Sequence, residues 1–259
     1  MRIVIAGPPK TGNMWLKCLL GRAYGLRWLR PFETPDRADL ASLLPWLAAN
    51  RFPDNTIFHQ HYDYSPEIAD ALEAVPAHLV TIVRDPYDAF VSTYHTLQLH
   101  AADNNQKGRK FTEIMGKPLD HPDVIDFLRH GGYRNNLLKA RDWAASGRAV
   151  VLRYENLIAD PLAELRRATA EIAQVAATFP PSPCAQGEEL GVRVLSDDSL
   201  ETAIDYCRAD RMRARTKGGA KHVRAATVGD SRGKLSEPHL KIFRERYGDL
   251  LRGLGYEVR

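Results

Sequence analysis

Lys10 and Thr11 stand in a glycine-containing turn between an apolar run and a stretch of helical periodicity. Residues 3–5 are apolar and β-branched, which is typical of a buried strand. From Trp15 onward, apolar residues recur at helical spacing. Such a turn presents free backbone N–H groups and the positive end of a helix dipole to an anion. Because Lys10 adds a cation and Thr11 a hydroxyl, the stretch predicts a phosphate-binding loop.

Gly7 and Gly12 have the separation of the two glycines in the Walker A loop, G-x-x-x-x-G-K-[ST]. That loop places lysine and a magnesium-binding hydroxyl directly after the second glycine, but Asn13 and Met14 stand there. The turn can therefore cradle a phosphate, but it lacks the usual metal ligand of a kinase or ATPase. The alternative interpretation is an ordinary strand-to-helix turn with a surface lysine.

A second cationic position follows a later strand. Residues 77–83 are almost continuously apolar, as expected of a central parallel strand, and Arg84 ends them. Asp85 and Pro86 then begin a helix, and Ser92 lies about two turns into it. An arginine fork with a hydroxyl can hold a phosphate dianion. A structural arginine and a solvent-facing serine are the alternative.

Both segments resemble the nucleotide-binding motifs of sulfotransferases that use 3′-phosphoadenosine 5′-phosphosulfate (PAPS). Residues 9–15, Pro-Lys-Thr-Gly-Asn-Met-Trp, are similar to the family's phosphosulfate loop P-K-[ST]-G-[TN]-x-W. Residues 84–95 are similar to R-[DN]-P-x-D-x-x-x-S-x-Y-H, the segment that binds the 3′-phosphate, and several matches in one short run make this similarity specific. The resemblance implies these nucleotide-binding residues: Lys10, Thr11, Gly12, Asn13, Met14, Trp15, Arg84 and Ser92.

Two further segments carry the resemblance. Residues 223–230 are similar to the family's R-K-G-x-x-G-D, whose arginine and neighbouring backbone clasp the 3′-phosphate. The resemblance assigns this role to Arg224, with Ala225 and Ala226 replacing Lys and Gly, although alanine lacks glycine's freedom for close backbone approach. A solvated basic loop is the alternative. Tyr154 opens a stretch similar to Y-E-[DN]-L, and either faces the nucleotide or supports the site.

Two histidines, His59 and His61, follow a predicted strand at 56–58. Sulfuryl transfer to a hydroxyl needs a base for the acceptor proton, and a histidine with a pKa near neutrality suits that task. The family's pattern K-T-H aligns its base with His61. The resemblance thus implies His61 as base and Lys10 as the cation that stabilises charge on the bridging oxygen. His59 as base, and a hydrogen-bonding role for both rings, stay open.

The elements that must position these residues alternate between strands and helices, which implies right-handed crossovers and a parallel sheet. We predict an α/β fold of the P-loop nucleotide-binding type, in which helices flank a central, mostly parallel sheet in three layers. Strands are expected near 3–5, 56–58, 77–83 and 149–154, and helices at 15–23, 65–75, 86–94, 133–145, 162–177, 199–213 and from 236. Ligands of such sheets lie outside the carboxyl ends of the strands.

The chain has 259 residues, 44% of them hydrophobic and 26% charged, which fits one sulfotransferase domain over residues 1–259. A net charge of +4 is too weak to indicate a nucleic-acid partner. Three cysteines without paired spacing argue against a disulfide framework and a zinc site. With no signal-like or membrane-spanning run, we expect a soluble, cytoplasmic protein with no membrane partner.

The implied reaction moves the sulfuryl group of PAPS to a hydroxyl or amine of a small-molecule or glycan acceptor, gives the product PAP, and needs no metal. Two alternatives stay open: a PAP-binding module without catalysis, and an ATP-dependent P-loop phosphotransferase. The acceptor and a homodimeric state are not determined. The segments expected to shape the acceptor pocket are 27–50, 100–132 and 178–200, and whether the polar 100–132 segment is a lid that orders on binding stays open.

Overall fold

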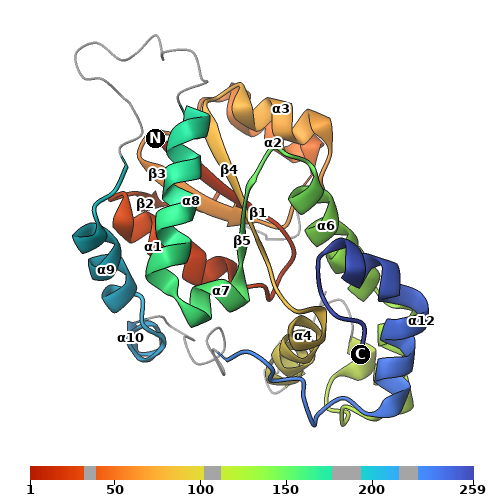
Figure 1. Cartoon of the computed structure of the whole chain (residues 1–259). Coiled ribbons are helices and arrows are strands. Elements are labelled where there is room, and N and C mark those ends of the chain that lie inside the picture. The colour runs from red at the N-terminus through yellow and green to blue at the C-terminus, as the bar shows by residue number, and fades with distance from the viewer. Residues whose placement is uncertain (32–38, 102–111, 177–193, 216–226) are drawn as a thin grey trace, which may run out of the picture.

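A five-stranded, wholly parallel sheet in the order β2-β3-β1-β4-β5 forms the centre of the computed structural model (Figure 1). The model describes residues 1–31, 39–101, 112–176, 194–215 and 227–259. The α/β fold class is confirmed, and the short edge strand β2 is an element that the sequence patterns did not predict. The strands are β1 (Arg2–Ala6), β2 (Arg27–Trp28), β3 (Thr56–Gln60), β4 (Ala77–Val83) and β5 (Val150–Arg153).

Alternating residues of the central strand β1 build the two faces of the sheet. Ile3 and Ile5 belong to the core beneath helices α1, α8 and α9, whereas Val4 and Ala6 belong to the core beneath α2, α3 and α6. Figure 1 shows the sheet between these two helical layers. The helices are α1 (Asn13–Ala23), α8 (Pro161–Ala176) and α9 (Asp197–Tyr206) on one side, and α2 (Leu40–Ala48), α3 (Pro66–Glu73) and α6 (Tyr133–Ala145) on the other.

A third, aromatic-rich core lies beyond the carboxyl end of β4, where α4 (Pro86–Ala101) packs with α5 (Pro122–His130) and α12 (Glu237–Gly253) (Figure 1). The described part of the polar 100–132 segment packs into this core. Residues Thr112–Ile114 form a short 3-10 helix, and Ile114, Val124 and Phe127 are buried. Burial of these side chains against α6 and α12 anchors the segment. Residues 102–111 lie outside the described part.

Other predicted elements need smaller corrections. The single helix expected over 199–213 is two helices, α9 and α10 (Ala209–Arg215), and the Tyr154 motif forms a short helix, α7 (Tyr154–Ala159), directly after β5. Ser65 caps α3 as predicted, because its hydroxyl accepts a hydrogen bond from Ile68 N–H. None of the helices described combines the length and apolar character that a bilayer crossing requires.

A disulfide joins Cys18 on α1 to Cys207 at the end of α9, with 6.0 Å between their Cα atoms. The prediction that the cysteines form no disulfide is therefore wrong. The two positions are 189 residues apart, so their pairing is invisible in local spacing and arises only because α9 packs on α1. Stable disulfides are typical of oxidising compartments, so this bridge does not support the predicted cytoplasmic location. The cytoplasmic location stays a prediction, and Cys184 lies outside the described residues.

We expect Cys207→Ser to lower the free energy of unfolding by about 2–4 kcal/mol, because a cross-link over a long loop restricts the unfolded chain. Urea unfolding, followed with and without reductant, measures the difference. Wild type in reductant should match the variant, and Cys184→Ser is the control that keeps the bridge. Equal midpoints for oxidised and reduced wild type would contradict the prediction.

Candidate active site

The loop between β1 and α1 is held in a tight turn by its own side chains. Lys10 and Gly12 have left-handed backbones, with φ of 70° and 109°. Thr11 Oγ1 and Asn13 Nδ2 both donate to the Pro8 carbonyl, at 3.1 and 2.7 Å. The side-chain donors of Thr11 and Asn13 are therefore used inside the loop. Asn13 Oδ1, by contrast, is buried without a hydrogen-bond partner among the described residues.

Aromatic rings lie directly against this loop. A Cβ at Gly12 would stand 2.9 Å from Tyr154 Cδ2, so the close approach of Tyr154 requires glycine there in addition to the positive φ. The Trp15 ring meets the Tyr154 ring edge to face, with 5.9 Å between centroids. Met14 is half-buried in the first turn of α1. The predicted residues Trp15 and Tyr154 thus share one surface beside the loop.

Arg84, at the carboxyl end of β4, is only 9% exposed, yet it has no carboxylate partner among the described residues. Its Nη1 donates to the Lys10 carbonyl and its Nη2 to the Thr227 carbonyl, both at 3.3 Å. Its Cζ lies 4.3 Å from the centroid of the Tyr154 ring. Its Nε is buried without a hydrogen-bond partner there. Since buried arginines are normally paired, this guanidinium is suited to receive an anion from outside the chain.

The carboxylates nearest to Arg84 in the sequence are engaged elsewhere. Asp85 Oδ1 accepts the N–H groups of Tyr87 and Asp88 at the start of α4, and Arg259 Nη2 contacts both oxygens of Asp85 at 3.1 and 3.0 Å. Burial raises the pKa of Asp85, and the Arg259 guanidinium opposes that shift. Glu155 Oε1 accepts Asp85 N–H at 2.8 Å. Asp85 and Glu155 therefore have hydrogen-bond and ion-pair partners other than Arg84.

Asp88 anchors the described end of the third predicted segment. Its two carboxylate oxygens accept the backbone N–H groups of Gly229 and Ser231, at 2.7 and 2.8 Å, and its side chain is fully buried. This anchoring brings Thr227 to Arg84 across 143 residues of sequence. Arg224, Ala225 and Ala226 lie outside the described residues, so their assignment stays a prediction.

We expect Asp88→Asn to lower the free energy of unfolding by about 1–3 kcal/mol and to weaken PAP binding several-fold. The amide supplies only one acceptor where two N–H groups need one each, so one buried N–H is left unpaired. Urea unfolding and calorimetric titration with PAP measure the two effects. Asp249→Asn, on the exposed side of α12, is the matched control, and equal stability of the two variants would contradict the anchoring role.

His61 lies just beyond β3, beside the loop, because β3 pairs with β1 in parallel register. Its Nδ1 is 2.8 Å from the Gly7 carbonyl oxygen. Since a carbonyl oxygen can only accept, the neutral ring carries its proton on Nδ1 and its lone pair on Nε2. The His59 ring is edge-on to the His61 ring at 5.8 Å. The geometry thus makes Nε2 the basic nitrogen of His61 whenever its ring is neutral.

The sheet brings most of the described residues that were predicted for the site to one edge, whereas Ser92 is not joined to them by a hydrogen bond. Lys10, Arg84, Tyr154 and Trp15 form a chain of contacts, and His61 joins it through Gly7. Ser92 is half-buried two turns into α4, and no hydrogen bond in the described structure joins its hydroxyl to Arg84.

Sequence reasoning assigned no role to four residues that shape this edge: Asp88, Lys139, Glu155 and Arg259. Asp88 and Glu155 belong to segments that resemble family motifs, so the sequence contained a pattern from which a role for them could have been predicted. Lys139 and Arg259 stand in no motif, and only the fold brings them to the site.

A family model described as a sulfotransferase domain matches residues 1–255. The chain belongs to the sulfotransferase family. No curated protein sequence matches this sulfotransferase significantly. The fold class and the nucleotide-binding loop architecture predicted from the sequence are those of this family.

Solved structures resemble this sulfotransferase in fold. A mouse sulfotransferase, SULT7A1, complexed with PAP, is 16% identical, with a TM-score of 0.67 over 97% of this chain and 84% of that chain. Retinol dehydratase in complex with androsterone and the inactive cofactor PAP is 14% identical, with a TM-score of 0.57 over 100% of this chain and 83% of that one. At these identities the likeness establishes the fold alone.

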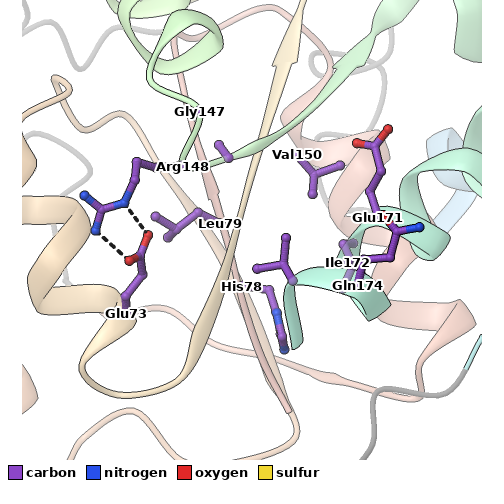
Figure 2. Close-up of a pocket in the computed structure, with 11 residues that line it drawn as sticks. Glu73, His78, Leu79, Gly147, Arg148, Val150, Glu171, Ile172 and Gln174 are labelled. Atoms are coloured by element: carbon purple, nitrogen blue, oxygen red, sulfur yellow. Dashed lines mark hydrogen bonds and ion pairs between the residues drawn. The ribbon is translucent and has the colours of Figure 1, made fainter. Parts of the chain in front are cut away.

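A cavity of about 430 Å³ lies at the opposite, amino end of the sheet, where β4 and β5 begin (Figure 2). Arg148 lies on its wall, already paired with Glu73 through two hydrogen bonds, as Figure 2 shows. Burial lowers the pKa of the neighbouring His78 to about 4, so its ring is neutral near pH 7. With its cation neutralised, this cavity is poorly suited to a phosphate, unlike the edge around Arg84.

Proposed function

We propose that this sulfotransferase transfers the sulfuryl group of PAPS to a hydroxyl or amine of a small-molecule or glycan acceptor, leaving PAP. The observation that carries the proposal is Arg84, a buried guanidinium without a described carboxylate partner beside the loop of residues 7–12. A phosphate dianion is the kind of ligand that such a group binds most strongly.

The residues at this edge fit such a nucleotide. Arg84 would hold the 3′-phosphate, with Arg224 and the backbone at Ala225 and Ala226 as further contacts and Ser92 as a hydroxyl donor. The loop around Lys10 and Gly12 would hold the 5′-phosphosulfate at the amino terminus of α1. The Trp15 and Tyr154 rings offer a surface for adenine. Two structural neighbours that carry PAP support this assignment.

In the proposed reaction His61 is the general base. As the acceptor oxygen attacks, its proton passes to His61 Nε2, and the resulting imidazolium keeps its Nδ1–H bond to the Gly7 carbonyl. The sulfuryl group that PAPS supplies forms its new bond to that oxygen while its bond to the phosphate oxygen breaks. Lys10 carries the positive charge that stabilises the leaving oxygen. No residue in this scheme acts through a metal.

The bound ligands of one structural neighbour bear on the acceptor class. Retinol dehydratase has been solved with androsterone and with retinol, which supports a small-molecule acceptor here. A single catalytic domain over residues 1–259 and a cytoplasmic location complete the proposal.

Calorimetric titration with PAP, and separately with ATP plus magnesium, tests the nucleotide assignment. Incubation with PAPS and a panel of phenols, alcohols, amines and oligosaccharides, followed by mass spectrometry, tests the transfer. PAP binding with a sulfated product supports the proposal. PAP binding without turnover on any acceptor indicates a binding module, and preference for ATP indicates a phosphotransferase.

A further inference from the structure

Helix α6 donates hydrogen bonds to two consecutive carbonyls of the segment that carries His61. Lys139 Nζ donates to the His61 carbonyl at 2.5 Å, and Trp143 Nε1 donates to the Tyr62 carbonyl at 2.9 Å. The two donors are four positions apart, so they project from the same face of the helix. They hold the peptide groups that follow His61 against the body of the protein.

Burial and an ion pair both restrict the Lys139 ammonium that donates to the His61 carbonyl. The Lys139 side chain is only 12% exposed, and its ammonium also pairs with Asp63 Oδ1 at 3.2 Å, a side chain that is 81% exposed. Trp143 and Tyr62 are fully buried. Because the ammonium is largely shielded and has an ion-pair partner at the rim, it is held at the His61 carbonyl rather than free to turn into solvent.

The imidazole itself is held from the other side. Its Nδ1 contacts the Gly7 carbonyl, and Gly7 is close-packed, because a Cβ there would stand 3.0 Å from Thr81 Oγ1 on β4. Gly7 N–H in turn donates to the Gln60 carbonyl at 3.3 Å. His61 is thus fixed at two points, its ring on the nucleotide loop and its main chain on α6.

We infer that Lys139 is a positioning residue for the reaction, and that its bond to the His61 carbonyl sets where His61 Nε2 points. The inference rests on the proposed role of His61 as the base. Removal of the ammonium takes away one of the two hydrogen bonds from α6 to this main chain, so the ring loses its fixed direction while the loop around Lys10 and the site of Arg84 keep theirs. Misplacement of a catalytic group by about 1 Å typically costs on the order of 10²-fold in rate.

The test compares Lys139→Met, which keeps an apolar stem of similar length, with Lys139→Arg, which keeps a donor. Lys241→Met on α12, whose lysine pairs with an exposed Glu245, is the matched control. We expect Lys139→Met to lower kcat by about 10–100-fold and to leave PAP affinity within about twofold of wild type. Lys139→Arg should recover most of kcat, and Lys241→Met should change neither quantity.

A second readout needs no acceptor. In protein labelled with ¹⁵N-histidine, the His61 signals, assigned through their loss in His61→Ala, report the ring tautomer. Wild type should show the proton on Nδ1, and Lys139→Met a mixture of both tautomers. An unchanged tautomer with unchanged kcat, or a parallel loss of kcat and PAP affinity, overturns the inference. If Lys139→Met does not fold, Lys139→Gln takes its place in both measurements.

The two proposals fail in different ways. Wild type that binds no PAP and transfers no sulfuryl group refutes the proposed function, and the tautomer in Lys139→Met still decides whether Lys139 orients His61. Wild type that is active while Lys139→Met is equally active refutes only the positioning role.

Discussion

Arg84→Ala is expected to weaken PAP binding by about 10²–10³-fold, a loss of roughly 3–4 kcal/mol, which corresponds to two charge-assisted hydrogen bonds. The guanidinium is buried, and the described residues offer it no carboxylate, so a bound phosphate would be its main electrostatic partner. Isothermal titration of wild type and variant with PAP, at one fixed salt concentration, measures the change.

Two further arginine variants serve as comparisons for Arg84→Ala. Arg84→Lys keeps the charge but loses the planar fork, so it should fall between wild type and Arg84→Ala. Arg148→Ala removes an arginine that is already paired with Glu73 at the opposite end of the sheet, and PAP affinity should stay within about twofold of wild type. PAP affinity of Arg84→Ala within about threefold of wild type would contradict the 3′-phosphate assignment.

His61→Ala is expected to lower kcat by about 10²–10⁴-fold, the range that general-base catalysis contributes, with PAP affinity within about twofold of wild type. The base must be unprotonated, so activity of wild type should fall in acid as the proposed base takes up a proton. That loss in acid should be absent from the residual activity of the variant. Steady-state rates with PAPS over a range of pH, with the acceptor that gives turnover, measure both effects.

His59→Ala is the matched control, because it removes a second imidazole whose ring centroid is 5.8 Å from that of His61. Its kcat should fall by less than about tenfold, since the bond to the Gly7 carbonyl that orients the proposed base belongs to His61. A large loss in His59→Ala with little change in His61→Ala would reverse the assignment and make His59 the base.

Patterns within one segment were enough to predict the elements that carry the site. The β-branched run of β1, the apolar run of β4 and the capped start of α3 each depend on neighbours in sequence, and all three are confirmed. Strand β2 has only two residues, both exposed, so it carries no hydrophobic signal. Helix α5 lies in a polar stretch, and its burial depends on α6 and α12.

The sequence of this protein by itself determined the family, the parallel α/β fold and the segments that meet at the edge of the sheet, because motifs and hydrophobic periodicity are local properties. Only the tertiary structure decided what surrounds each group. It joined Cys18 to Cys207, paired Asp85 with Arg259 across 174 residues, and brought Lys139 to His61 across 78. Such contacts depend on how elements far apart in the sequence pack together, so local periodicity cannot predict them.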